Sequence, residues 1–242
     1  GQTLYHNPKE KVSIQLGNGK LLSQLSKKKI VYDFRQNDIL NGGEGAPLTP
    51  IFHKYLILTK KLALPACILN IGGISNLTLV KDLNDHNIIS KDVGPGCCLI
   101  DNWIKTHTDN KFDQDGNISE RGKINELILE QALEVHENNF QKKNNFSLDT
   151  NDFDISFVRG LSIEDGAATL SAFTAKIVSS NIDFLIKEFE KKEIKIVISG
   201  GGRKNKNLIK NIKLFSKKNV LFYNSENYKL NGDFIESQAF AY

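Results

Sequence analysis

The chain has 242 residues, of which 40% are hydrophobic, and this is enough for one large domain or two small ones. The net charge of +4 comes from 32 basic and 28 acidic residues, and no basic stripe is interleaved with aromatic residues. No apolar run approaches the ~20 residues that span a bilayer, and no signal-peptide pattern opens the chain. We therefore expect neither a nucleic-acid partner nor a membrane partner.

The cysteines and histidines argue against a disulfide framework and against a metal centre. The three cysteines are an odd number, and Cys97 and Cys98 are adjacent. The five histidines have no metal-ligand spacing. We predict a cytoplasmic protein with reduced thiols and no metal-binding cluster of side chains.

The N-terminal region contains short predicted elements. A weakly alternating strand at 12–16 runs into a hairpin-like turn at Gly17-Asn18-Gly19. A second short strand is predicted at 29–32. A glycine-rich loop then leads into a helix predicted from Pro47 to about Leu62, with the proline in its first turn.

Two strands are predicted within residues 66–80, on either side of Gly72 and Gly73. Backbone N–H groups in such a turn can point at a phosphate, because no Cβ intervenes. The alternative is an ordinary hairpin whose turn requires positive φ.

Asp92 follows a short predicted strand at 87–90 and precedes a turn forced by Gly94, Pro95 and Gly96. A carboxylate at the end of a strand can face a ligand and act as a base. The alternatives are a cap for the next helix and an ordinary surface carboxylate.

Helices and strands alternate through the rest of the chain, which predicts an α/β fold. Residues 138–157 are rich in Asn, Lys and Asp and are predicted to form an exposed excursion. The predicted helices are 97–106, 123–138, 165–190, 205–215 and 233–242, and the predicted strands are 194–199 and 220–223.

Gly200, Gly201 and Gly202 separate a predicted strand from a predicted helix that begins near Asn205. Three glycines at this place allow a ligand to approach the backbone and the helix N-terminus. The alternative is a tight turn with no ligand. Arg35 can bind an anion through two hydrogen bonds or form a surface ion pair, and Glu236 is an ordinary helix-face residue on sequence grounds.

Taken together and in order, these segments resemble the anhydro-N-acetylmuramic acid kinases. Each motif is weak alone, but the matching stretches are collinear and span essentially the whole chain. They are residues 1–8, 33–38, 42–50, 69–78, 92–96 with Leu99 and Asp101, 112–116, 147–149, 168–170 with Thr174 and Ala175, 200–202 with Asn205, Glu236, and 239–241.

The resemblance implies the sugar kinase/Hsp70/actin fold, an α/β architecture of two RNase H-like lobes that bind ATP between them. Residues 1–64 are expected to form the remainder of the first lobe, with 233–242 packing back onto it, and residues 65–232 the second lobe. The family's N-terminal glycine/serine/threonine phosphate loop precedes the matched region, so the first lobe is expected to be incomplete in this chain.

The resemblance also implies an activity in peptidoglycan recycling. With ATP and Mg²⁺, the family opens the small amino sugar 1,6-anhydro-N-acetylmuramic acid hydrolytically and phosphorylates O6 to give N-acetylmuramate 6-phosphate. Asp92 is implied to be the base that activates water. The implied sugar-binding residues are Gln2, Thr3, Arg35 and Glu236, and the implied nucleotide-binding residues are Gly72, Gly73, Asn76, Gly200, Gly201, Gly202 and Asn205.

The sequence departs from the family beside Asp92. Val93 and Cys97 stand where the family usually has threonine and asparagine, which removes two hydrogen-bonding groups. Two alternatives therefore stay open: a non-catalytic nucleotide- or sugar-binding protein of the same fold, and a kinase for another sugar. A homodimer formed through a helix face is compatible with each.

Overall fold

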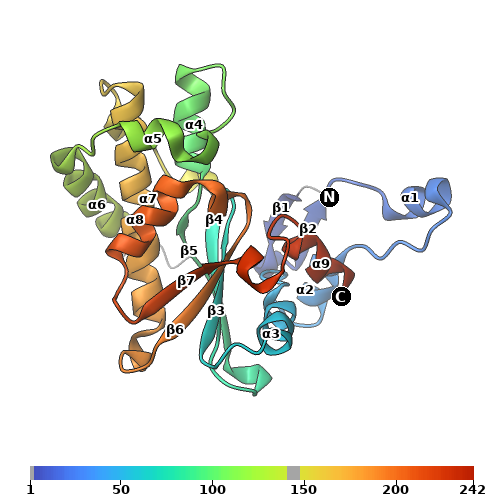
Figure 1. Cartoon of the computed structure of the whole chain (residues 1–242). Helices are drawn as coiled ribbons and strands as arrows, with labels where there is room; N and C mark the ends of the chain where they lie inside the picture. The colour runs from blue at the N-terminus through green and yellow to red at the C-terminus, as the bar shows by residue number, and fades with distance from the viewer. Residues whose placement is uncertain (1–2, 141–147) are drawn as a thin grey trace. The chain divides into compact units, whose positions relative to one another are not determined.

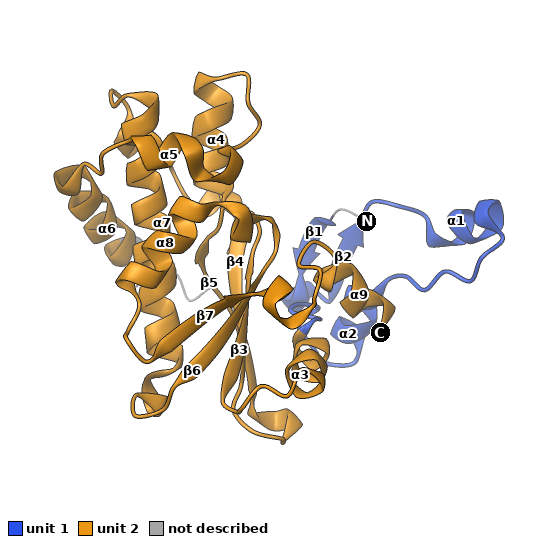
Figure 2. Cartoon of the chain, viewed as in Figure 1, with its two compact units in different colours: residues 1–49 blue, residues 50–242 orange. Residues whose placement is uncertain are grey.

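The computed structural model describes residues 3–140 and 148–242. The chain divides into two compact units, residues 1–49 and residues 50–242 (Figure 2). The lobe boundary predicted at 64/65 and the predicted packing of 233–242 onto the first lobe stay predictions.

The first unit contains a two-stranded antiparallel sheet and two short helices. The predicted hairpin turn at 17–19 is wrong, because the strand before it pairs with an earlier strand and not with a later one. The Asn18 side chain accepts a hydrogen bond from the backbone N–H of Leu21 and so caps a helix. The strand predicted at 29–32 is also wrong, because these residues find no pairing partner. The elements are β1 (Thr3–Asn7), β2 (Val12–Gln15), α1 (Gly19–Ser26) and α2 (Phe34–Leu40).

The second unit is built on a five-stranded sheet in the order β5-β4-β3-β6-β7. β3, β4 and β5 pair antiparallel, whereas β6 and β7 are parallel to β3. This is the strand arrangement of an RNase H-like lobe, so the predicted α/β class is confirmed. The bounds are β3 (Ala66–Ile71), β4 (Ile74–Val80), β5 (Ile88–Pro95), β6 (Ile194–Ser199) and β7 (Val220–Asn224).

Helices cover both faces of this sheet (Figure 1). The larger core lies between the sheet and α4–α8, and a smaller core lies between the opposite face and α3 with Ile235 of α9. No helix in the described parts of the chain has the length and apolar character to cross a membrane. The bounds are α3 (Pro50–Thr59), α4 (Cys98–His107), α5 (Asn117–Arg121), α6 (Glu126–Phe140), α7 (Ile163–Leu185), α8 (Lys206–Phe215) and α9 (Ile235–Ala241).

Two boundaries in the second unit differ from the prediction. Helix α3 begins at Pro50 and not at Pro47, which lies in the preceding loop. β5 continues to Pro95, so Asp92 lies inside the strand and not after its end, because pairing with β4 extends through the glycines. Of the excursion predicted at 138–157, residues 141–147 lie outside the described residues.

A buried hydrogen-bond chain connects α3 to the sheet. His53 Nδ1 lies 2.7 Å from Thr78 Oγ1, which lies 3.1 Å from Ser90 Oγ on β5. His53 is 3% exposed, and burial lowers its pKa from 6.5 to about 4. The imidazole is therefore neutral in the folded protein at neutral pH.

This burial predicts a loss of stability in mild acid. The unfolded chain protonates His53 near pH 6.5 and the folded chain only near pH 4, so the stabilisation is full above pH 6.5 and is lost as the pH falls toward 4. The lost free energy of unfolding is about 3 kcal/mol. Urea unfolding at pH 7 and pH 4.5 measures it.

His53→Gln is the matched control, because glutamine is neutral at both pH values and can still bond to Thr78. The wild-type protein should lose more stability than this variant. Equal losses would show that His53 does not carry the effect.

Candidate active site

Strand register places four polar residues in one row across the sheet. Asp92 on β5 pairs with Asn76 on β4, Asn76 pairs with Asn70 on β3, and Asn70 pairs with Ser199 on β6. Residues paired in this way present their side chains on the same face of a sheet. We call Asp92, Asn76, Asn70 and Ser199 the polar row.

The polar row lies on the face covered by α3 and α9. Side chains alternate between faces along a strand, and the neighbours of Asn70, Leu69 and Ile71, belong to the larger core on the other face. Ile68, two residues before Asn70, belongs to the smaller core beneath α3. This face is therefore apolar where α3 covers it and polar toward the glycine turns.

An irregularity in β5 directly follows Asp92. The register shifts between Ser75 and Asn76, so that Val93 is an extra residue opposite β4. Val93 is fully buried in the larger core, and a side chain at Gly94 would meet Ile177 of α7. Val93 thus faces away from the polar row, and the family's threonine is replaced at a position that does not face the site.

Asp92 is not a helix cap. Its Oδ2 accepts a hydrogen bond of 2.8 Å from the backbone N–H of Leu148. The N-cap of α4 is Cys97, which makes no side-chain capping bond, and burial raises the pKa of its thiol to about 12. The carboxylate is half-buried and lies on the same face as the smaller core.

The Gly72–Gly73 turn does not need glycine for its own geometry. Neither residue has positive φ, and a Cβ at either would meet only atoms 3.6 Å away. β3 and β4 do form an antiparallel hairpin around this turn, but the positive φ expected for it is wrong. Small residues here leave the turn open to a ligand, as a phosphate site requires.

The end of β5 is fastened to this turn. The backbone N–H groups of Gly96 and Cys97 donate to the carbonyls of Gly73 and Gly72, each at 2.8 Å. A Cβ on Gly96 would lie 2.2 Å from the Gly72 oxygen, so this position has no room for a side chain. The strand that carries Asp92 and the glycine turn are thus held as one unit.

The second glycine turn adjoins the polar row directly. Gly200 has φ +80°, and a Cβ there would lie 2.5 Å from Asn70 Oδ1. Gly201 is exposed, with open space around it. The Asn205 side chain accepts from the Leu208 N–H and caps α8, so its predicted role at the adenosine stays a prediction.

The four predicted sugar-binding residues are divided between the units. Gln2 lies outside the described residues. Thr3 accepts a hydrogen bond from Gln15, and Arg35 donates 2.7 Å to the Gly45 carbonyl, both within the first unit. Glu236 is exposed on α9, which packs on the same sheet face as the polar row. Their roles stay predictions.

Asn70 and Ser199 were missed as site residues by the sequence analysis. Ser199 Oγ lies 3.5 Å from Asn70 Oδ1, and both adjoin a glycine turn. The sequence signal is weak: Asn70 is the one polar residue of the apolar strand β3, whereas Ser199 ends a strand that also contains Lys195. Only the pairing of β3 with β6 brings Asn70 and Ser199 next to each other.

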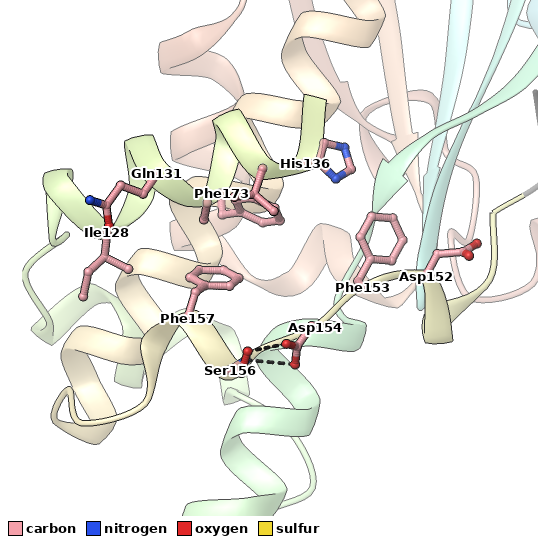
Figure 3. Close-up of a pocket in the computed structure, with 11 residues that line it drawn as sticks. Ile128, Gln131, His136, Asp152, Phe153, Asp154, Ser156, Phe157 and Phe173 are labelled. Carbon is pink, nitrogen blue, oxygen red and sulfur yellow. Dashed lines mark hydrogen bonds between the residues drawn. The ribbon is translucent and has the colours of Figure 1, made fainter. Parts of the chain in front are cut away.

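A cavity of about 430 Å³ lies elsewhere in the second unit, between α6, α7 and residues 152–157 (Figure 3). It is lined by Phe153, Phe157, Phe173 and His136 among others, and burial lowers the pKa of His136. These aromatic residues pack on the larger core, so the cavity is on the opposite side of the sheet from the polar row.

Comparisons with known proteins show the family of this chain. The family model for anhydro-N-acetylmuramic acid kinase matches residues 1–242. The chain belongs to this family. A relative named anhydro-N-acetylmuramic acid kinase from Pelagibacter ubique is 51% identical over 242 residues, and one from Zymomonas mobilis is 38% identical. Both matches cover all of this chain.

The chain spans 64% and 63% of the length of these two relatives. Among solved structures, the activator of the 2-hydroxyisocaproyl-CoA dehydratase from Clostridium difficile with bound ADPNP has a TM-score of 0.42 and 15% identity. That match covers 74% of this chain and 59% of the other.

If Gly73 lines a phosphate site, alanine at this position should weaken ATP binding without unfolding the protein. The added Cβ fits the fold but fills space beside the turn. We expect Gly73→Ala to change stability by about 0.5 kcal/mol or less and to lower ATP affinity about tenfold. Thermal unfolding and calorimetric titration measure the two effects.

Gly96→Ala is the contrasting variant, because its Cβ would collide with the Gly72 carbonyl and should destabilise the fold itself. Unchanged ATP affinity in a folded Gly73→Ala protein would remove this turn from the phosphate site.

Proposed function

We propose that this chain is the greater part of an ATP-dependent kinase that opens 1,6-anhydro-N-acetylmuramic acid and phosphorylates O6, giving N-acetylmuramate 6-phosphate for peptidoglycan recycling. The observation that carries the proposal is the polar row, in which a half-buried carboxylate stands beside two glycine turns. The family match over residues 1–242 supports it. Three free thiols accord with a cytoplasmic location.

Asp92 acts as the general base in this proposal. It takes a proton from a water molecule whose oxygen attacks the anomeric carbon. The bond from that carbon to the bridging oxygen breaks, and the bridging oxygen stays on C6 and takes the γ-phosphoryl group as ADP leaves. The hydrogen bond from Leu148 holds the carboxylate in one orientation.

The two glycine turns position the nucleotide. Gly72 and Gly73 are assigned to the phosphates, and Asn76, also assigned to the nucleotide, lies next to Asp92 in the polar row. Gly200, Gly201 and Gly202 with Asn205 are assigned to the adenosine side. Positioning and electrostatic stabilisation are the dominant contributions to phosphoryl transfer, which suits a site made mainly of backbone and amide groups.

Mg²⁺ would reach this site bound to the phosphates of ATP. The described residues contain no group of three or more His, Cys, Asp and Glu side chains that could hold a metal ion. Mg²⁺ is commonly held by substrate phosphates together with one or two carboxylates, and no side chain is assigned to it here because Asp92 is kept as the base. Bound with ATP, it supplies charge stabilisation at the transferred phosphoryl group.

The sugar is assigned to Thr3, Arg35 and Glu236, with Gln2. Arg35 is suited to the lactyl carboxylate, because a guanidinium binds carboxylates through two parallel hydrogen bonds. A homodimer formed through a helix face also stays a prediction.

Sugar-dependent release of ADP by the full-length protein tests the proposal. Asp92→Asn should lower kcat by ~10²–10⁴-fold and leave ATP affinity largely unchanged, because the base is lost while the glycine turns remain. Asp109→Asn, at an exposed carboxylate in the loop after α4, is the matched control and should retain full activity.

Three outcomes contradict the proposal or a part of it. Sugar binding without turnover in the wild-type protein would favour a non-catalytic binding protein, and turnover of another sugar alone would favour a different kinase. Full activity in Asp92→Asn would remove Asp92 from the role of base.

A further inference from the structure

Arg203 is a buried cation directly after the second glycine turn. The residue is 7% exposed, although the two carboxylates that it contacts are partly exposed. Its Nε and Nη2 donate to Glu226 Oε1 at 2.8 and 2.6 Å, and its Nη1 donates to Asp233 Oδ1 at 2.7 Å. A buried charge is tolerated only with such partners.

The same guanidinium contacts the turn itself. Arg203 Nη1 also donates 2.8 Å to the carbonyl of Gly200. The Gly200 N–H in turn donates to the Gly232 carbonyl at 3.2 Å. A Cβ on Gly232 would lie 2.5 Å from Arg203 Nε, so the two segments are in close contact.

The segment on the other side leads into α9. Asp233 lies two residues before the start of this helix and three before Glu236. Hydrogen bonds from Arg203 and Lys204 lower the pKa of the Asp233 carboxyl to about 2, so it stays ionised at any working pH. Arg203 therefore joins the residues assigned to adenosine with the helix that carries a residue assigned to the sugar.

Arginine suits this task better than lysine does. Its planar guanidinium has donors in a fixed fork, and here they reach two carboxylates and one carbonyl at the same time. A lysine has one ammonium group on a flexible stem and cannot span the three acceptors in this arrangement.

We propose that Arg203 is a positioning residue that fixes the Gly200–Gly202 turn and the start of α9 in one arrangement, so that the nucleotide and the sugar are held correctly together. The inference rests on the proposed function for its effect on catalysis. Arg203 acts through the turn and the helix, and Asp92 still performs the chemistry.

Arg203→Lys in the full-length protein tests the effect on both substrates. Charge-assisted hydrogen bonds are lost, so KM for ATP and KM for the sugar should each rise about tenfold or more, while kcat falls much less. Lys204→Gln, which removes only the exposed contact to Asp233, is the matched control and should change neither KM.

Chemical rescue separates positioning from a general loss of structure. In Arg203→Ala, guanidinium ion at low millimolar concentration should lower both KM values again, whereas sodium at the same ionic strength should not. Absence of rescue in a folded Arg203→Ala protein, or a rise in only one KM in Arg203→Lys, would overturn the inference.

Hydrogen exchange gives a readout that does not depend on turnover. In Arg203→Lys, backbone amides in 200–204 and in 231–241 should both exchange faster, while those of β3 and β4 should not change. Faster exchange in one segment alone would overturn the inference. If the wild-type protein releases no ADP with the sugar, the proposed function fails. The hydrogen-exchange rates of 200–204 and 231–241 in Arg203→Lys still decide whether Arg203 joins these two segments.

Discussion

The register of four neighbouring strands is the constraint on which the candidate site depends. Backbone hydrogen bonds align Asp92 with Asn76, Asn76 with Asn70, and Asn70 with Ser199. Side chains alternate between the two faces of the sheet. A slip of one residue in β4 would therefore point Asn76 toward the larger core and place Leu77 on the face that carries the polar row. The extra residue at Val93 comes directly after Asp92, and pairing with β4 resumes at Gly94.

The face that carries the polar row is apolar at one end of the strands and polar at the other. Where α3 covers it, Ile68, Val80 and Val197 form the smaller core, and apolar burial stabilises the fold. At the other end the strands finish in glycine turns with half-buried amides and one carboxylate. The neutral His53 and its bond to Thr78 lie between these zones. This arrangement gives a rigid support to a polar site, which catalysis by positioning requires.

Much of this could be predicted from the sequence, because the decisive signals are local. Apolar strands followed by glycines predicted the Gly72 and Gly200 turns, and alternating helices and strands predicted the α/β class. The extent of β5 could not be predicted, because Gly94 and Pro95 indicate a turn and only pairing with β4 makes them part of a strand. Asn70 and Ser199 have only a weak local signature, because strand pairing alone brings them together. The ion cluster of Arg203 joins residues 30 positions apart in sequence.

The central claim is that Asp92 directs water to the anomeric carbon while the bridging oxygen remains on C6 and receives the phosphoryl group. The most direct test is to run the reaction of the full-length protein in ¹⁸O-labelled water, to quench it early, and to locate the label in the product by fragment mass spectrometry. The account predicts ¹⁸O at C1 and none in the phosphate ester. Label in the phosphate ester, or a phosphorylated sugar whose anhydro bridge is intact, would contradict it.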